Sequence, residues 1–170
     1  MKRVSCIVFV ILSLSFAACK KPSPQLPANK GVETDTTSSV LLKINNALIV
    51  REDSAIRKFA ENNGSFQKNG LGFWYKIFMS GTGRAITDSL ICNYEFRMES
   101  LNGRLFQKGI NRIVIGKKQT IVGLEEGIKM MHKGDSAVFV IPWYLGYGAK
   151  GEDHFIKPYT SLLYKVNVMY

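Results

Sequence analysis

Cysteine and histidine can support covalent or metal chemistry, and in this 170-residue sequence their number and spacing limit both. His132 and His154 stand alone, and no Cys/His cluster has the spacing of metal ligands. Cys92 lies between Ile91 and Tyr94 in an apolar stretch, which predicts a buried thiol in a strand. We therefore expect no metal ion and no other cofactor.

Cys19 is the thiol whose surroundings indicate a reaction. It follows Ala17 and Ala18, after an apolar run over 7–16 that is too short for the ~20 residues of a membrane span. Such a run is typical of a signal peptide, and a small pair directly before Cys resembles the bacterial lipobox. We expect residues 1–18 to be a lipoprotein signal peptide and Cys19 to be lipidated. Ordinary secretion with cleavage nearby is the alternative.

Removal of the signal peptide changes both the cysteine count and the charge. Cys6 leaves with it, so Cys92 has no partner and we expect no disulfide. The net charge falls from +10 to +8, because Lys2 and Arg3 also leave. Outside the cytoplasm this excess indicates a solvated basic surface, or an anionic membrane or envelope polymer nearby. We expect no nucleic acid partner.

Tyr147 is the aromatic residue whose setting argues most strongly for contact with a ligand. It lies between Gly146 and Gly148, in a stretch typical of a loop, where a purely packing role is not expected. Tyr94 and Phe106 have the spacing of strand residues and could equally fill the core of a β domain.

Two segments precede the region that carries these residues. Residues 19–39 hold three prolines and a polar run, which predicts a disordered tether. Apolar residues then recur at helical spacing until Asn62-Asn63-Gly64. We expect one helix, or two broken ones, from about 41 to 62 within a helical appendage over 40–66. It would pack on the domain or on a partner.

The remaining chain is rich in strand signals. Residues 73–79, 88–98, 113–115, 136–141 and 162–169 are apolar or alternate between apolar and polar, and Asn102-Gly103 predicts a hairpin turn. The segment 121–131 carries Leu124, Ile128 and Met131 on one face of a predicted helix. The pattern predicts an α+β domain in which a curved antiparallel sheet wraps around one amphipathic helix.

Several blocks within 71–170 resemble the FKBP-type peptidyl-prolyl cis-trans isomerases. The resemblance rests on blocks in a fixed order: Thr120-Ile121-Val122-Gly123-Leu124-Glu125-Glu126-Gly127-Ile128, Lys133-Gly134-Asp135, Phe139-Val140-Ile141-Pro142, and Leu145-Gly146-Tyr147-Gly148. It implies an FKBP-like domain over 71–170. With its tether and helix, the chain is similar to lipid-anchored members associated with gliding motility.

The resemblance also implies a binding pocket, and it requires no nucleophile. Rotation of an X-Pro bond is slow because the twisted amide loses resonance, and an apolar cleft favours the less polar twisted form. By resemblance, Tyr94, Phe106, Ile121 and Tyr147 are the catalytic residues, with Tyr94 and Phe106 as one wall. The Ile121 N–H and the Tyr147 hydroxyl would donate to substrate carbonyls. The substrate-binding residues would be Thr120, Leu124, Phe155, Ile156, Tyr164 and Gln107.

Three features depart from the usual family pattern. Gln107 replaces the usual Asp, Leu124 replaces the usual Trp, and the segment from Phe106 to Gly116 is shorter than is usual. Two functions are therefore expected. One is a prolyl isomerase, weakened by Gln107, that assists the folding of exported proteins. The other is a non-catalytic chaperone or assembly module that binds extended segments.

The partners and the compartment follow from the resemblance and from Cys19. We expect proline-containing segments of exported proteins as substrates, the membrane as a partner through a lipid anchor, and binding of macrolide inhibitors. Lys20 and Lys21 follow Cys19 in place of an acidic pair, so we expect the protein to face the periplasm.

Overall fold

The computed structural model describes residues 36–169, and their side chains from Ser39 onward. The predicted signal peptide, Cys19 and all but the last residues of the predicted tether lie outside the described residues. From Leu42 onward the described chain forms one compact unit.

Helix α2 spans Thr36–Asn62 without interruption. It begins inside the segment predicted to be a tether and ends where the Asn-Asn-Gly signal predicted. Both the backbone N–H and the side-chain amide of Asn63 donate to the carbonyl of Phe59, at 3.1 and 2.8 Å, and Gly64 follows with φ +103°. These bonds end the helix, because the last carbonyls of a helix lack partners within it. No helix of residues 36–169 is long and apolar enough to cross a membrane.

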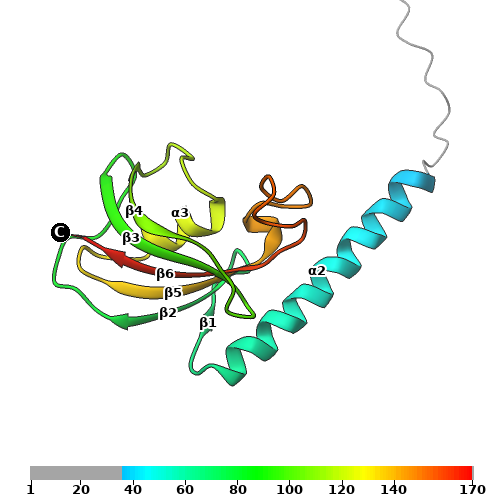
Figure 1. Ribbon diagram of the computed structural model, residues 1–170, viewed down its shortest axis with the longest axis horizontal. Coiled ribbons are helices and arrows are strands. Elements are labelled where there is room, and N and C mark those ends of the chain that lie inside the picture. Colours follow the sequence, from blue (N-terminus) through cyan, green and yellow to red (C-terminus); the bar gives the residue numbers. More distant parts are fainter. Residues whose placement is uncertain (1–35, 170) are drawn as a thin grey trace, which may run out of the picture. The chain divides into compact units, whose positions relative to one another are not determined.

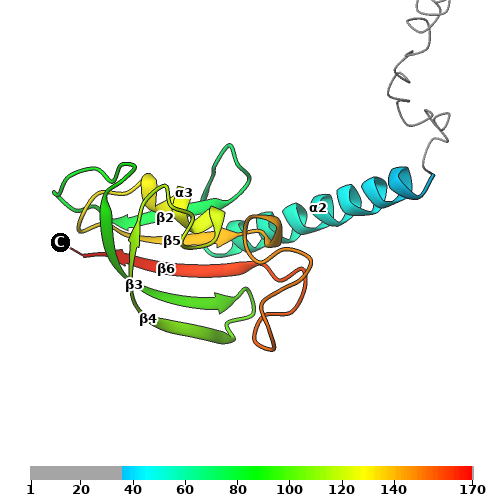
Figure 2. The same ribbon diagram turned by 90° about the horizontal axis from the view of Figure 1, so that it is seen from above.

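Six strands form one antiparallel sheet in the order β1-β2-β5-β6-β3-β4. Their bounds are β1 Gln67–Lys68, β2 Trp74–Met79, β3 Ile91–Ser100, β4 Leu105–Val114, β5 Ser136–Ile141 and β6 Leu162–Val168. Figure 2 shows this order from β2 to β4, with helix α3 (Val122–Lys129) on one side. We call the face that carries α3 the inner face and the opposite one the outer face.

The β3–β4 hairpin turns at the predicted Asn-Gly pair, where Gly103 has φ +82° and the Arg104 carbonyl accepts from the Ser100 N–H. Residues 113 and 114 of the predicted run over 113–115 are the end of β4, a strand of ten residues of which nine pair with β3. The segment from Phe106 to Val114 therefore forms a strand with no excursion of its own.

Helix α3 packs so closely on β5 that it needs glycine. A Cβ atom on Gly127 would lie 2.7 Å from the ring of Phe139, and one on Gly123 would lie 2.5 Å from Ile141. Beside them, the buried carboxylate of Glu125 accepts from the Gly116 N–H and holds the loop before the helix. The Glu-Glu-Gly block is therefore explained by packing and by one backbone hydrogen bond.

The inner core is centred on α3, as the alternation predicted. Leu124, Ile128 and Met131 are at most 1% exposed and pack with the inner-facing residues of β3, β5 and β6. The outer face has a smaller cluster, in which Ile56 of α2 packs with Val140 and Leu163. The helix before the domain thus packs on the sheet through its C-terminal half (Figure 1).

Candidate functional site

A hollow of about 330 Å³ opens on the inner face beside the start of α3, and we call it the inner hollow. Seven of the predicted site residues line it: Tyr94, Gln107, Thr120, Ile121, Leu124, Tyr147 and Tyr164. They come from β3, β4, β6, α3, the loop before α3 and the loop that follows β5, so the fold brings together residues that are far apart in sequence.

Tyr94 forms the back of the inner hollow. Its side chain is 1% exposed, yet its hydroxyl accepts a hydrogen bond from the Asn111 amide at 3.3 Å and is also bonded to Thr120. Burial raises the pKa of Tyr94 above its ordinary value, so the phenol stays neutral.

Tyr147 lies in a loop that backbone hydrogen bonds hold in place. The loop follows a short 3₁₀ helix, η2 (Trp143–Leu145), and the Gly148 N–H donates to the Trp143 carbonyl at 2.8 Å. Gly148 has φ +68°, a conformation that few other residues adopt. The predicted loop with its flanking glycines therefore exists, and Tyr147 points a half-buried side chain into the inner hollow.

The hydroxyl of Tyr147 is the centre of a hydrogen-bonded chain. It bonds to the Tyr164 hydroxyl on one side and to the Glu152 carboxylate on the other. Burial, followed by the contact with Glu152, raises the pKa of Tyr147 to about 12, and burial raises the pKa of Tyr164 as well. Both phenols are thus proton donors at neutral pH.

The start of α3 supplies the floor of the inner hollow. Leu124 is buried, and Ile121 is the N-cap residue of the helix. The N–H of an N-cap residue is not used by the hydrogen bonds of its own helix. Ile121 lines the hollow that holds the Tyr147 phenol, and its backbone N–H is not used within α3.

Three predicted site residues lie elsewhere. Phe106, Phe155 and Ile156 line a second hollow of about 370 Å³ together with Met98, and we call it the rim hollow. Tyr94 and Phe106, which were predicted to form one wall, therefore line different hollows. The β3–β4 register pairs Tyr94 with Asn111 and Met98 with Gln107, which places Phe106 about 13–16 Å along the strands from Tyr94.

The two hollows share Gln107 and Glu152. Ile156 is 1% exposed and belongs to the floor of the rim hollow, whereas Phe155 is 71% exposed at its edge. The Arg104 guanidinium lies 5.6 Å from the centre of the Phe106 ring.

Five residues that line the inner hollow were not among the predicted site residues: Phe96, Asn111, Lys118, Gln119 and Glu152. The Phe96 ring centre lies 5.9 Å from that of Tyr94 and 6.1 Å from that of Tyr164. Phe96 shares the alternating face of Tyr94, which could have identified it. Four of the five are polar, so the cleft is more polar than the predicted apolar one.

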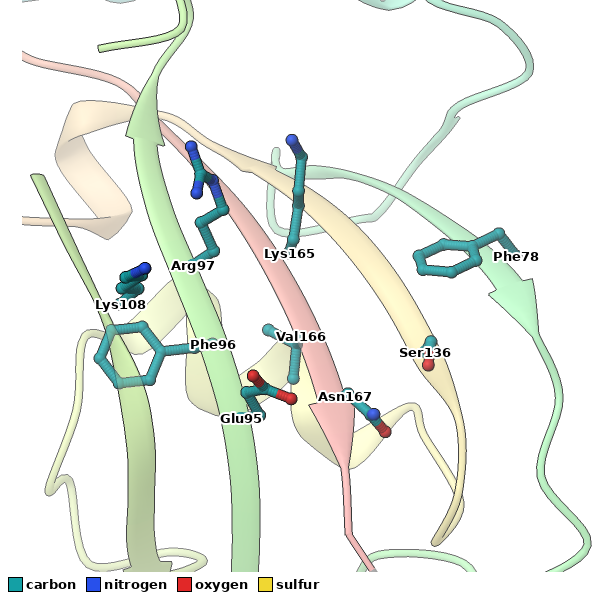
Figure 3. Close-up of a pocket in the computed structure, with 9 residues that line it drawn as sticks. All are labelled: Phe78, Glu95, Phe96, Arg97, Lys108, Ser136, Lys165, Val166 and Asn167. Atoms are coloured by element: carbon teal, nitrogen blue, oxygen red, sulfur yellow. The ribbon is translucent and has the colours of Figure 1, made fainter. Parts of the chain in front are cut away.

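A third hollow, of about 350 Å³, lies on the outer face, and Figure 3 shows the residues around it. It extends from Phe78 on β2 to Lys108 on β4 and includes Arg97 and Lys165. Both of these cations bind the buried Glu99 carboxylate, Lys165 at 3.1 Å. We call this region the outer depression. In residues 36–169 no group of three or more His, Cys, Asp or Glu side chains could hold a metal ion.

Comparison with known proteins agrees with this geometry. Residues 82–169 match the FKBP-type peptidyl-prolyl cis-trans isomerase family. The chain is 33% identical over 103 residues to a probable FKBP-type peptidyl-prolyl cis-trans isomerase of Haemophilus influenzae, a match that covers 58% of this chain and 42% of that protein. It is 31% identical over 103 residues to the peptidyl-prolyl cis-trans isomerase Mip of Coxiella burnetii, covering 58% and 44% of the two proteins.

Solved structures share the fold. FkpA from Escherichia coli aligns with a TM-score of 0.64 at 23% identity, covering 98% of this chain and 81% of that one. AtFKBP13 aligns with a TM-score of 0.60 at 20% identity, covering 63% and 98% of the two chains. The sequence matches above span less than half the length of either curated relative. The α+β fold and the family resemblance predicted from the sequence are confirmed, and the chain belongs to the FKBP-type peptidyl-prolyl cis-trans isomerase family.

Proposed function

We propose that this protein is a peptidyl-prolyl cis-trans isomerase that binds X-Pro segments in the inner hollow. The observation that carries the proposal is the pairing of two hydrogen-bond donors there. Tyr147, which has a hydroxyl donor, and Ile121, whose N–H is not used within α3, line one hollow, with Leu124 and Phe96 as its apolar surfaces.

These groups suit a reaction that needs no bond to be broken. The barrier to rotation is ~18–20 kcal/mol. The rate of rotation rises tenfold for each ~1.4 kcal/mol by which the site stabilises the twisted amide over the planar one. The Tyr147 hydroxyl would hold the carbonyl that precedes the rotating bond, and the Ile121 N–H would hold a second carbonyl. The bond then rotates against apolar surface that disfavours the planar, more polar amide.

A non-catalytic binding function is the alternative, and two observations favour it. The side chain beside Phe106 is the neutral Gln107, and the inner hollow is lined by more polar groups than a dry isomerase cleft needs. A polar hollow keeps water near the substrate, which weakens the preference for the twisted amide. Such a protein would bind extended segments as a chaperone or assembly module without accelerating their isomerisation.

We further propose that the protein is anchored to a membrane through lipidated Cys19, faces the periplasm and acts on exported proteins. The lipobox-like Ala17-Ala18-Cys19 sequence supports the anchor. The likeness to gliding-motility isomerases is part of the same proposal. Incorporation of labelled fatty acid into the wild type but not into Cys19→Ser tests the anchor.

A prolyl-isomerisation assay on the full chain decides between the two functions. We expect an Ala-Leu-Pro-Phe peptide to isomerise faster with the protein than without it, and a macrolide of the FKBP-inhibitor class to suppress the increase. Binding of the peptide without acceleration would establish the alternative. Failure to bind either peptide or macrolide would contradict both functions and leave only the fold.

A further inference from the structure

Glu152 is the carboxylate of the inner hollow, and the loop fixes its backbone. The Glu152 N–H donates to the Ile156 carbonyl at 2.9 Å, and the Ile156 N–H returns a bond of 3.1 Å to the Glu152 carbonyl. The preceding Gly151 has φ +72°, and a Cβ atom on it would lie 2.2 Å from the Ile156 carbonyl oxygen. This tight turn places the Glu152 side chain at the border that the inner and rim hollows share.

Tyr147, Tyr164 and Glu152 have few protons to share among their side chains. A tyrosine hydroxyl has one proton to donate, and an ionised carboxylate can only accept. Since Tyr147 bonds to Glu152, its proton points at the carboxylate, and its oxygen accepts the proton of Tyr164. In the ligand-free protein, the Tyr147 donor is therefore already occupied.

We propose that Glu152 is a positioning residue that competes with the substrate carbonyl for the single hydroxyl proton of Tyr147. The proposal rests on the proposed function, in which this proton binds the substrate. Binding then requires the Tyr147–Glu152 bond to open, and Glu152 sets how readily the cleft accepts a carbonyl.

The surroundings of the two residues allow this exchange. The Glu152 side chain is exposed, so water can hydrate the carboxylate as soon as Tyr147 leaves it. Tyr147 is half-buried and keeps its bond to Tyr164, so only the direction of one O–H has to change. A carboxylate is nevertheless a stronger acceptor than a peptide carbonyl, because the hydrogen bond is charge-assisted. The Tyr147–Glu152 hydrogen bond is therefore favoured until substrate is present.

The test measures binding of an Ala-Leu-Pro-Phe peptide to the full chain in two backgrounds. In the wild-type background, Glu152→Ala should tighten binding about two- to tenfold, the equivalent of one neutral hydrogen bond. Glu152→Gln keeps a weaker, neutral acceptor and should give a smaller gain. In the Tyr147→Phe background neither substitution should change the affinity, because the contested proton is absent.

A second measurement follows the bond itself. Titration of tyrosinate absorption, compared with the matching Tyr147→Phe protein, gives the pKa of Tyr147. Glu152→Gln should lower this pKa from about 12 towards its ordinary value of 10. Asp153→Asn, which removes the same charge from the next residue of the loop, should shift it less, because no hydrogen bond joins that side chain to Tyr147 among the described residues.

The outcomes separate the two proposals. If Glu152→Ala raises peptide affinity equally in the wild-type and Tyr147→Phe backgrounds, the gain is a general effect of charge, and the proposed competition for the Tyr147 proton is wrong. A loss of affinity in the wild-type background, or no change in it, would overturn the competition as well, while peptide binding still supports the proposed function. A wild-type protein that binds no proline peptide at all would overturn the proposed function and the competition together. A Tyr147 pKa that does not respond to Glu152→Gln would exclude the bond.

Discussion

The two faces of one sheet have opposite chemistry, although the same strands build both. On β3, Tyr94 faces the inner hollow and Arg97 faces the outer depression, while Phe96 lines both. On β6, Tyr164 joins the hydroxyl chain of the inner hollow, and its neighbour Lys165 binds Glu99 at 3.1 Å on the outer side. Successive residues of a strand point to opposite faces, so this division follows from alternation alone.

The difference lies in how each face satisfies its polar groups. On the inner face the hydroxyls of Tyr147 and Tyr164 are hydrogen-bonded to each other. The Tyr147 hydroxyl also bonds to the Glu152 carboxylate, which is exposed to water and can give up this bond. The outer face pairs its cations with the buried Glu99 and leaves the apolar Phe78 exposed at 58%. A hydroxyl can exchange its partner at little cost, whereas a cation pulled from a buried carboxylate leaves a charge unpaired. The comparison therefore favours the inner face as the one that binds a ligand.

The largest expected difference between the faces is in stability. Ile128→Ala removes a completely buried side chain from the inner core and should lower the free energy of unfolding by about 2–5 kcal/mol. Phe78→Ala on the outer face removes a mostly exposed ring and should cost well below that range. Urea unfolding of both variants gives the comparison. A loss below about 1 kcal/mol for Ile128→Ala would mean that α3 does not fill the inner face.

The second-largest expected effect is a loss of stability at alkaline pH, which depends on the tyrosines of the inner face. The folded protein holds the pKa of Tyr147 at about 12, and burial also raises the pKa of Tyr94 and of Tyr164. The unfolded chain loses these protons near pH 10, so the stabilisation is complete below pH 10 and is lost as the pH rises through about 12. The free energy of unfolding should therefore fall in this range, and less steeply in Tyr147→Phe. Equal slopes in the two proteins would contradict the assignment.

The sequence predicted those parts of the site that depend on local pattern. Alternation placed Tyr94 and Tyr164 on the inner face, and the glycines around Tyr147 indicated its loop. Tyr94 and Asn111 each lie eight residues from the Asn102-Gly103 turn, so a regular hairpin already pairs them, as the structure does. The Asn111 partner of Tyr94 is therefore predictable from the sequence.

Other features depend on tertiary structure and had no local signal. The register of the β3–β4 pair shifts between Met98 and Glu99, so that Phe106 is an extra, unpaired residue of β4, and no residue type announces such a bulge. The separation of Phe106 from the inner hollow follows from that pairing. Glu152 is an exposed loop residue among other polar residues, and only the turn closed by Ile156 brings its carboxylate to Tyr147.

A smaller effect is expected from the hydroxyl at the centre of the proposed site. Tyr147→Phe removes one hydrogen bond to the substrate, worth ~0.5–1.5 kcal/mol, and should reduce peptide affinity or isomerisation rate about two- to tenfold. Tyr75→Phe is the matched control, since its hydroxyl bonds to Gln67 at 2.9 Å, outside the inner hollow. If both variants lose the same amount, the Tyr147 hydroxyl has no special part in binding.

The smallest effect should come from the outer face. Lys165→Gln removes one of the two cations that bind Glu99, and Lys165 is about half exposed, at 49%. The Arg97 guanidinium remains bonded to the same carboxylate, so Glu99 keeps a charged partner. An ion pair with one exposed member contributes at most about 1 kcal/mol, and salt screens it. The free energy of unfolding should therefore fall by less than 1 kcal/mol, and the difference from wild type should shrink in high salt. Peptide affinity should not change, because Lys165 faces away from the inner hollow. A clear loss of affinity would show that the outer depression takes part in binding, and the distinction between the two faces would then be wrong.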